Sequence, residues 1–126
     1  LPYLIINMEA IHIYGIPNCD VTKKALAWLK KEKLGYIFHD YKKEGASAKK
    51  LNEWCKQIDW TILLNKRGTT WKQLPSTIQD GIKDQATAVK IMQEYTSLIK
   101  RPVIENAGRI VTGFQEKAYA GLLLKG

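Results

Sequence analysis

The sequence predicts an α/β fold in which a βαβ unit at the start and a ββα unit at the end share one four-stranded mixed sheet. Residues 10–41 contain an alternating apolar stretch, a helical pattern and a second β-prone stretch. Their length of about thirty residues is that of a parallel βαβ unit. Residues 103–122 contain a hairpin signal followed by a helical pattern, and helical periodicity fills the chain between the two parts.

The first half is predicted from side-chain periodicity. Ile11 and Ile13 alternate with His12, which is typical of a strand. After a Gly/Pro turn, apolar residues recur at helical spacing with lysines on the other face, which predicts a helix that ends at residues 34–35. Its apolar residues are Val21, Ala25, Trp28 and Leu29. Residues 36–41 are rich in aromatic side chains and predict the second strand.

The middle of the chain, about residues 47–99, is predicted to be a helical insertion. Ser47 is the candidate N-cap of one helix, and Asp84 or Thr87 is the candidate cap of a later one. Between them, residues 65–71 form a polar loop of the kind that often carries binding groups. The apolar face of the first helix is Leu51, Trp54, Cys55 and Ile58, and that of the second is Ala88, Ile91, Met92, Tyr95, Leu98 and Ile99.

The last part predicts two strands and a closing helix. Residues 106–108, Asn-Ala-Gly, lie between two β-prone stretches, which indicates a hairpin. Phe114, Ala118 and Leu122 mark the helix. The complete order is the thioredoxin-like plan, in which a proline starts the third strand beside the helix that carries a cysteine. Pro102 is in that position, and the sequence leaves open whether its peptide bond is cis.

Length, charge and cysteine content limit the function classes. A chain of 126 residues predicts one domain, assigned to residues 8–126, because Met8 is a candidate initiator and residues 1–7 are interpreted as an upstream segment. Two cysteines without ligand spacing predict neither a disulfide framework nor a metal site, and favour the cytoplasm. No membrane segment is expected. The net charge of +8 is scattered, which favours solvated helix faces and acidic partners over direct nucleic-acid binding.

Cys19 is the candidate nucleophile. It opens the first predicted helix, where backbone N–H groups and the macrodipole favour a thiolate, and such a position can lower a cysteine pKa from about 8.5 to roughly 3.5–7.5. The hydroxyl of Thr22 can donate to the sulfur. Lys23 and Lys24 favour the anion, whereas Asp20 opposes it. The alternative is a small structural cysteine buried at a helix start.

Three other residues have less specific patterns. Cys55 lies on an apolar helical face, so we interpret it as structural, with a resolving thiol as the alternative. His12 and His39 lie in strand patterns without a partner nearby in sequence. A packed or surface role is favoured for each of them over that of a catalytic base.

Three stretches together resemble the arsenate-reductase-related ArsC/Spx/YffB family of thioredoxin-fold proteins, most closely its YffB branch. The resemblance covers nearly everything from Met8 onward. It implies that Cys19 is the single reactive cysteine and that Arg101 and Pro102 are the anion-binding arginine and its adjoining proline. The stretches are residues 14–20 (YGIPNCD) followed by 23–25 (KKA), residues 63–71 (LLNKRGTTW) and residues 99–103 (IKRPV).

The sequence departs from the family pattern at two sites. Arsenate reductases of this kind use three arginines, but the first falls at or near Asn65, two residues from Arg67, and the third near Thr112 and Gly113. Arsenate is therefore not expected as the true substrate, because charge-assisted hydrogen bonds would be lost. Spx-like regulators, which bind RNA polymerase, use a Cys-x-x-Cys switch that Thr22 rules out here.

The resemblance implies a glutathione-dependent thiol–disulfide oxidoreductase, a thiol reductase of the ArsC type. Cys19 would attack a disulfide or another oxidised centre. Glutathione, as co-substrate and not as a bound cofactor, would release the product because position 22 carries no cysteine. Alternatives are an Spx-like regulator that binds RNA polymerase and a residual arsenate reductase. The expected substrate-binding residues are Arg101, Pro102, Asn18, Thr22 and Arg67.

Overall fold

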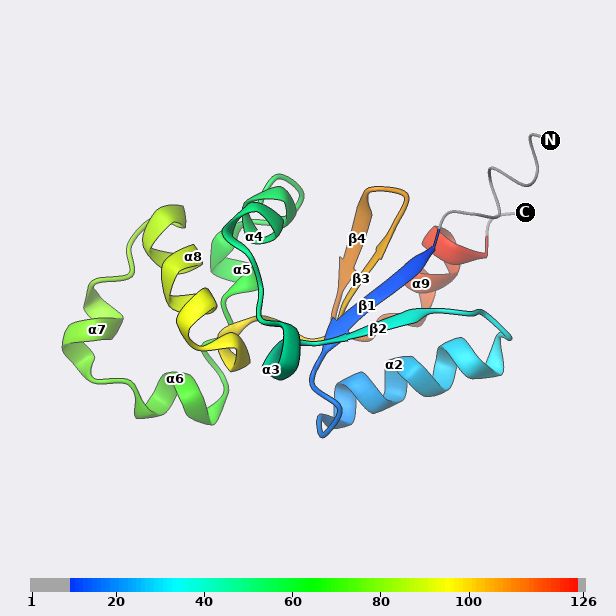
Figure 1. Ribbon diagram of the computed structural model, residues 1–126, viewed down its shortest axis with the longest axis horizontal. Coiled ribbons are helices and arrows are strands. Elements are labelled where there is room, and N and C mark those ends of the chain that lie inside the picture. The colour runs from blue at the N-terminus through cyan, green and yellow to red at the C-terminus, as the bar shows by residue number, and fades with distance from the viewer. Residues whose placement is uncertain (1–9, 125–126) are drawn as a thin grey trace. The chain divides into compact units, whose positions relative to one another are not determined.

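The computed structural model describes residues 10–124, so the interpretation of residues 1–7 as an upstream segment lies outside the described residues. The chain divides into two compact units (Figure 1). The sheet unit combines Leu1–Asp40 with Arg101–Gly126, and the helical unit is Tyr41–Lys100. None of the helices within residues 10–124 is long and apolar enough to cross a membrane.

Within the described residues, the sheet unit contains the predicted four-stranded mixed sheet. The strand order is β2-β1-β3-β4, with β1 parallel to β2 and antiparallel to β3. β3 and β4 form the predicted hairpin, and its turn residues Ala107 and Gly108 have φ angles of 51° and 79°, as a tight two-residue turn requires. The strands are β1 (Ile11–Gly15), β2 (Ile37–Asp40), β3 (Val103–Asn106) and β4 (Arg109–Thr112).

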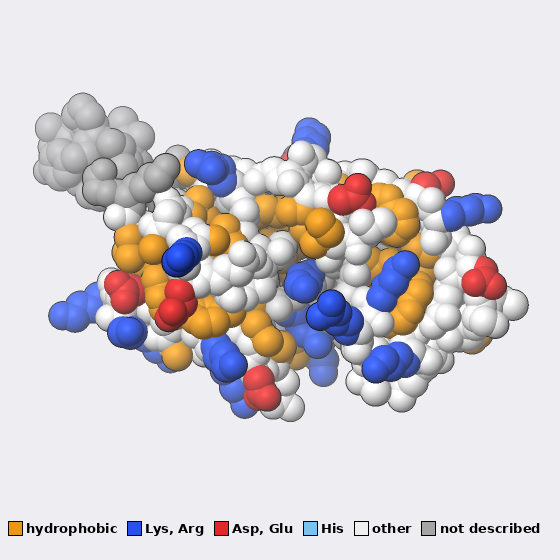
Figure 2. All heavy atoms as spheres, turned by 180° about the vertical axis from the view of Figure 1, so that it is seen from behind, with side chains coloured by type: hydrophobic (Ala, Val, Ile, Leu, Met, Phe, Trp, Pro, Cys, Tyr) orange, Lys and Arg blue, Asp and Glu red, His pale blue; other side chains and the backbone are white. Residues whose placement is uncertain are grey.

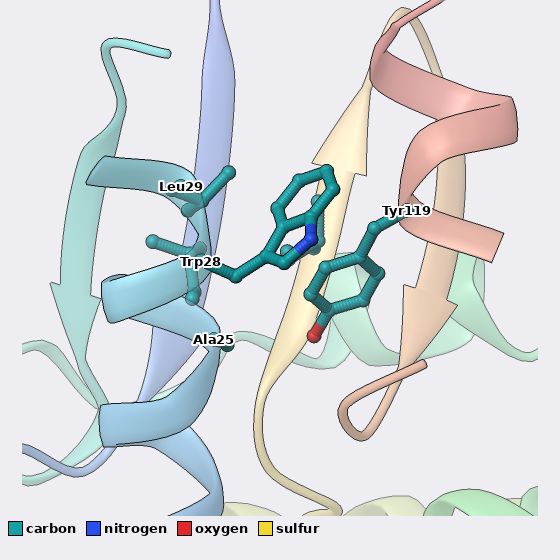
Figure 3. Packing of buried hydrophobic residues seen from close by; sticks show 6 residues of the cluster. Ala25, Trp28, Leu29 and Tyr119 are labelled. Atoms are coloured by element: carbon teal, nitrogen blue, oxygen red, sulfur yellow. The ribbon is translucent and has the colours of Figure 1, made fainter. Parts of the chain in front are cut away.

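Two helices, α2 (Asp20–Lys31) and α9 (Glu116–Leu123), pack on one face of this sheet. Trp28 of α2 meets Tyr119 of α9 edge to face, with ring centroids 5.5 Å apart (Figure 3). Ile13 and Ile104, paired across β1 and β3, lie beneath them and are fully buried. Because each large apolar side chain contributes about 1.5–3 kcal/mol when buried, this core holds α2, and the residue that starts it, against the sheet.

Helix α2 ends earlier than predicted. Lys33 has a φ of 58°, and the Leu34 N–H donates to the Leu29 carbonyl at 2.9 Å, so a left-handed residue ends the helix at Lys31. Leu34 still packs against the core. Its apolar character therefore reflects a contact made after the helix and not a further helical turn.

The helical unit contains six α-helices and one 3-10 helix within the described residues. The predicted caps are present: Ser47 accepts a hydrogen bond from the Lys50 N–H, while Asp84 and Thr87 form a capping box. The helices are α3 (Tyr41–Glu44), α4 (Ala48–Trp54), α5 (Trp60–Leu63), α6 (Thr69–Gln73), α7 (Ser76–Asp80), α8 (Gln85–Glu94) and η1 (Thr96–Leu98).

The sequence predicts two continuous helices in this unit, and the predicted length of each is wrong. Helix α4 stops at Trp54, before Cys55 and Ile58, and α8 stops at Glu94. The helical spacing of the later apolar residues is fortuitous, because Ile99 instead forms a β-bridge with Leu64. Tyr41, predicted as the end of a strand, begins α3 and is buried in the helical unit.

Candidate active site

Cys19 is the N-cap of α2 and lies where the chain leaves β1 for the helix. Its backbone is extended, with φ −131° and ψ 124°, and its carbonyl accepts the first helical hydrogen bond from the Lys23 N–H at 2.9 Å. The side chain is half-buried and forms no disulfide with the other cysteine, Cys55. The thiol therefore lies at the end of the helix where the N–H groups have no helical acceptor.

The surroundings of the sulfur lower the pKa of Cys19 from 9.0 to about 7. Burial acts in the opposite direction and raises it. The decrease comes from the backbone N–H and hydroxyl of Thr22, the side chain of Arg101 and the backbone N–H of Val21, all of which favour the anion. About half of the protein would carry a thiolate at pH 7.

Thr22 contributes a buried hydroxyl to this environment. The residue is fully buried, and Oγ1 forms no hydrogen bond of good geometry with any of the described residues. The hydroxyl nevertheless lowers the pKa of Cys19, so it stabilises the anionic form of the sulfur. A buried hydroxyl without a partner costs about 1–3 kcal/mol, a cost that a thiolate acceptor would reduce.

Arg101 and Pro102 come from a later part of the sequence, directly before β3, and lie at the same end of the sheet as Cys19. Arg101 precedes β3 and is half-buried, and its side chain lowers the pKa of Cys19. The Arg101–Pro102 peptide bond is cis. Pro102 is buried, and its carbonyl accepts a 2.8 Å hydrogen bond from the Gly113 N–H, which ties the start of β3 to the end of β4.

The structure thus brings together four of the six residues expected at the site: Cys19, Thr22, Arg101 and Pro102. Asn18 is adjacent to Cys19 and exposed. Arg67 belongs to the helical unit, where its N–H donates to the Asn65 side chain at 3.1 Å.

Arg67 lines a polar pocket of about 270 Å³ in the helical unit. Two lysines that the sequence analysis did not select, Lys66 and Lys100, line it as well, and the residues that form it include no acidic side chain. Lys66 also lies over the Trp71 ring, with Nζ 5.2 Å from the centroid. Three cations around one hollow can attract an anion.

The remaining basic side chains are distributed widely. Figure 2 shows lysine and arginine side chains at many places over both units on the face in view, together with exposed hydrophobic and acidic side chains. This distribution agrees with solvated helix faces.

His12 and His39 form a pair that the sequence analysis missed. His12 Nδ1 lies 2.8 Å from His39 Nε2, Tyr14 stacks on His39 with centroids 4.3 Å apart, and the Tyr14 hydroxyl donates to Glu105 at 3.3 Å. The sequence contained one indication of this pair. Side chains alternate between the two faces of a strand, which places His12 and Tyr14 on the face of β1 opposite Ile13. Within residues 10–124, no group of three or more potential ligands is placed to hold a metal ion.

Cys55 differs from Cys19 in its electrostatic environment. It is the C-cap of α4 and is half-buried. Burial and the charge of Asp59 raise its pKa, so the thiol stays protonated at neutral pH. This environment favours a structural role over that of a resolving thiol.

Comparison with known proteins assigns the chain to a family. Residues 14–122 match the model of the ArsC family. The chain belongs to the ArsC family. Its match to that model includes both the helix start with Cys19 and the segment with Arg101.

Several relatives of this ArsC-family chain are known. A solved protein named YffB is 41% identical, with a TM-score of 0.86 and coverage of 90% of this chain and 99% of the other. An arsenate reductase (ArsC) related protein from Brucella melitensis is 40% identical, with a TM-score of 0.70 and coverage of 94% and 98%. The global transcriptional regulator Spx of Streptococcus pneumoniae is 24% identical over 108 residues, which are 84% of this chain and 80% of Spx.

Proposed function

We propose that this ArsC-family protein is a glutathione-dependent thiol reductase in which Cys19 is the nucleophile. The observation that carries the proposal is the pKa of Cys19, about 7, at a helix start beside the Arg101 side chain. Reactive cysteines are typically those that are partly exposed and ionised near neutral pH. Membership of a family with arsenate-reductase-related relatives supports the same reaction class.

The first step is thiol–disulfide exchange. The Cys19 thiolate attacks one sulfur of a glutathione mixed disulfide, an S–S bond forms between Cys19 and glutathione, and the substrate leaves as a thiolate that takes a proton from water. A second glutathione thiolate then attacks the glutathione sulfur bound to Cys19, which restores the Cys19 thiolate and releases oxidised glutathione. The second glutathione is the reductant, because its sulfur is oxidised from thiol to disulfide as the substrate sulfur is reduced to a thiol, and no second protein cysteine takes part.

The groups around the sulfur assist both steps. The N–H groups of Val21 and Thr22 stabilise the anion when Cys19 attacks and again when it departs. Arg101 can hold a carboxylate beside the reacting sulfur through charge-assisted hydrogen bonds, with Pro102 fixing the backbone next to it. Asn18, which is adjacent to Cys19 and exposed, is proposed as a further substrate contact.

Carboxylates suit this protein better than arsenate. Among residues 10–124, Arg101 is the cationic side chain that lowers the pKa of Cys19. By the family resemblance, Asn65 stands at or near the place of another arginine of the arsenate reductases. A tripeptide with separated carboxylates needs one cation at each, whereas arsenate needs several at one point. We expect the reaction in the cytoplasm, where reduced glutathione is abundant.

The test measures both ionisation and turnover. Alkylation of Cys19 across pH should give a pKa near 7, and reduction of a glutathionylated peptide by glutathione should be abolished by Cys19→Ser. Cys55→Ser is the matched control and should retain activity. A Cys19 pKa at or above about 8.5, the value of a free thiol, or full activity in Cys19→Ser would contradict the proposal.

The relation to Spx favours a second candidate, a regulator that binds RNA polymerase. A pull-down of RNA polymerase with wild type and Cys19→Ala separates the two. Stable capture by both proteins, together with absence of peptide reduction, would favour the regulator.

A further inference from the structure

Gly15, the last residue of β1, lies against the side chain of Thr22. A Cβ atom at position 15 would come within 2.8 Å of Thr22 Oγ1 and 3.1 Å of Thr22 Cγ2. The first distance is too short for any two such atoms, so a side chain at position 15 would force one of the two residues to move. Gly15 itself is buried.

The backbone does not account for a glycine at this position. The glycines with left-handed φ angles among the described residues are Gly45, Gly108 and Gly113, and Gly15 is not one of them. Glycine in a strand otherwise costs about 0.5–1 kcal/mol relative to alanine. A strand glycine with an ordinary φ marks a place where another group approaches closely, and here that group is Thr22.

We propose that Gly15 is a positioning residue for the nucleophile, because its missing side chain leaves the space in which the Thr22 hydroxyl lies beside the Cys19 sulfur. The inference rests on the proposed function in that Cys19 is the reacting thiol. Gly15 does not touch the substrate. It acts through Thr22, and Thr22 acts on the sulfur.

A methyl group at position 15 would turn Thr22 away. Thr22 is fully buried, so its short side chain can escape the contact mainly by rotating about χ1. A helical threonine has a second common rotamer in which the hydroxyl bonds to a carbonyl of the preceding turn. In that rotamer the hydroxyl points away from the sulfur, and the thiolate loses one of the groups that lower the pKa of Cys19.

The experiment is a double-mutant cycle read by the Cys19 pKa from pH-dependent alkylation, which requires no substrate. Gly15→Ala should raise the pKa by about one unit, which reduces the thiolate fraction at pH 7 about fivefold. Thr22→Ala should raise it similarly, and Gly15→Ala/Thr22→Ala should equal Thr22→Ala alone, because no hydroxyl remains to be displaced.

Gly35→Ala is the matched control. An added Cβ at position 35 meets nothing within 4 Å among the described residues, so this variant should keep the wild-type pKa. Circular dichroism should confirm that every variant is folded. If Gly15→Ala alone fails to fold, Gly15→Ala/Thr22→Ala should still fold, because the two close contacts are gone.

Each outcome decides the matter. The inference would be overturned if Gly15→Ala left the Cys19 pKa unchanged. It would also be overturned if Gly15→Ala raised that pKa equally in the wild-type and Thr22→Ala backgrounds, or if the double variant failed to fold. A wild-type pKa at or above about 8.5 would instead refute the proposed function itself, whatever the variants do. A wild-type value near 7 with no effect of Gly15→Ala leaves the proposed function intact.

Discussion

The side chain of Arg101, just before β3, lies close enough to the sulfur of Cys19, just before α2, to lower its pKa. The sheet topology produces this contact between two distant parts of the sequence. β1 and β3 are antiparallel neighbours with Tyr14 opposite Val103, so the end of β1 and the start of β3 lie at one edge of the sheet. The residues that follow β1 and precede β3 therefore meet there.

Replacing Arg101 with Gln should raise the pKa of Cys19 by about 0.5–1 unit, because the thiolate loses a charged hydrogen-bond donor while half-exposed to screening water. The pH profile of alkylation measures the change. Arg109→Gln removes an equal charge from the exposed start of β4 and is the matched control. A similar shift in both variants would show that net charge, and not the contact, controls the thiol.

The substrate role of Arg101 requires a separate measurement. If its side chain also holds a carboxylate of glutathione, Arg101→Gln should raise KM for glutathione beyond what the loss of thiolate explains. Measuring turnover at a pH well above both pKa values removes the ionisation effect. An unchanged KM there would limit Arg101 to the stabilisation of the thiolate.

The stability of the protein should depend on pH through Cys19. The folded pKa, about 7, lies below the unfolded value, so the contribution to the free energy of unfolding is present above the unfolded pKa and is lost as pH falls through 7. Between pH 6 and pH 9.5 the free energy of unfolding of wild type should rise by about 1–2 kcal/mol relative to that of Cys19→Ser, after a discount for solvent screening. Chemical denaturation of both proteins at the two pH values provides the test.

Cys55 should give the opposite sign. Its pKa is raised in the folded state, so its contribution is present below the unfolded pKa and is lost as pH rises. Wild type should therefore lose stability relative to Cys55→Ser over the same interval. If the free energy of unfolding changed in the same direction with pH for both cysteines, the result would contradict the difference between their environments.

Local sequence was sufficient to predict the part of the site within one helical turn. Cys19 and Thr22 are three positions apart at a helix start, so their proximity follows from chain geometry. The hairpin was predictable for a similar reason, since Asn106-Ala107-Gly108 suits a tight turn. Arg101 is different: periodicity gave no sign of its contact with Cys19, and only the family resemblance of residues 99–103 selected it.

Other features depend on tertiary contacts that no local pattern shows. The apolar residue Ile99 continues a helical period, yet it pairs with Leu64 in a bridge. Helices α6 and α7 have no fully buried residue, so they lack the apolar stripe by which a helix is recognised. The need for space beside Gly15 likewise cannot be predicted from local sequence, because it depends on where Thr22 lies in the folded chain.

The Tyr119 hydroxyl should stabilise the sheet unit. It donates a hydrogen bond to the Gly113 carbonyl, and burial raises the pKa of Tyr119 so that the donor proton is retained. Tyr119→Phe should lower the free energy of unfolding by about 0.5–1.5 kcal/mol, because the ring packing remains while the carbonyl loses its donor. Tyr36→Phe, on a less buried tyrosine, is the control in denaturant unfolding. An equal loss in both would argue against a specific role for the Gly113 contact.

The contact between His12 and His39 should appear as a coupling energy. Their ring nitrogens are 2.8 Å apart across two parallel strands, so removing either imidazole removes this contact. In a double-mutant cycle with His12→Ala and His39→Ala, unfolding at pH 8 should give a coupling of about 0.5–1.5 kcal/mol. Tyr14 stacks on His39 and could contribute indirectly, so the cycle should be repeated with Tyr14→Leu. A coupling that vanishes in the Tyr14→Leu background would assign the energy to ring stacking, whereas a persistent coupling assigns it to the hydrogen bond between the two imidazoles.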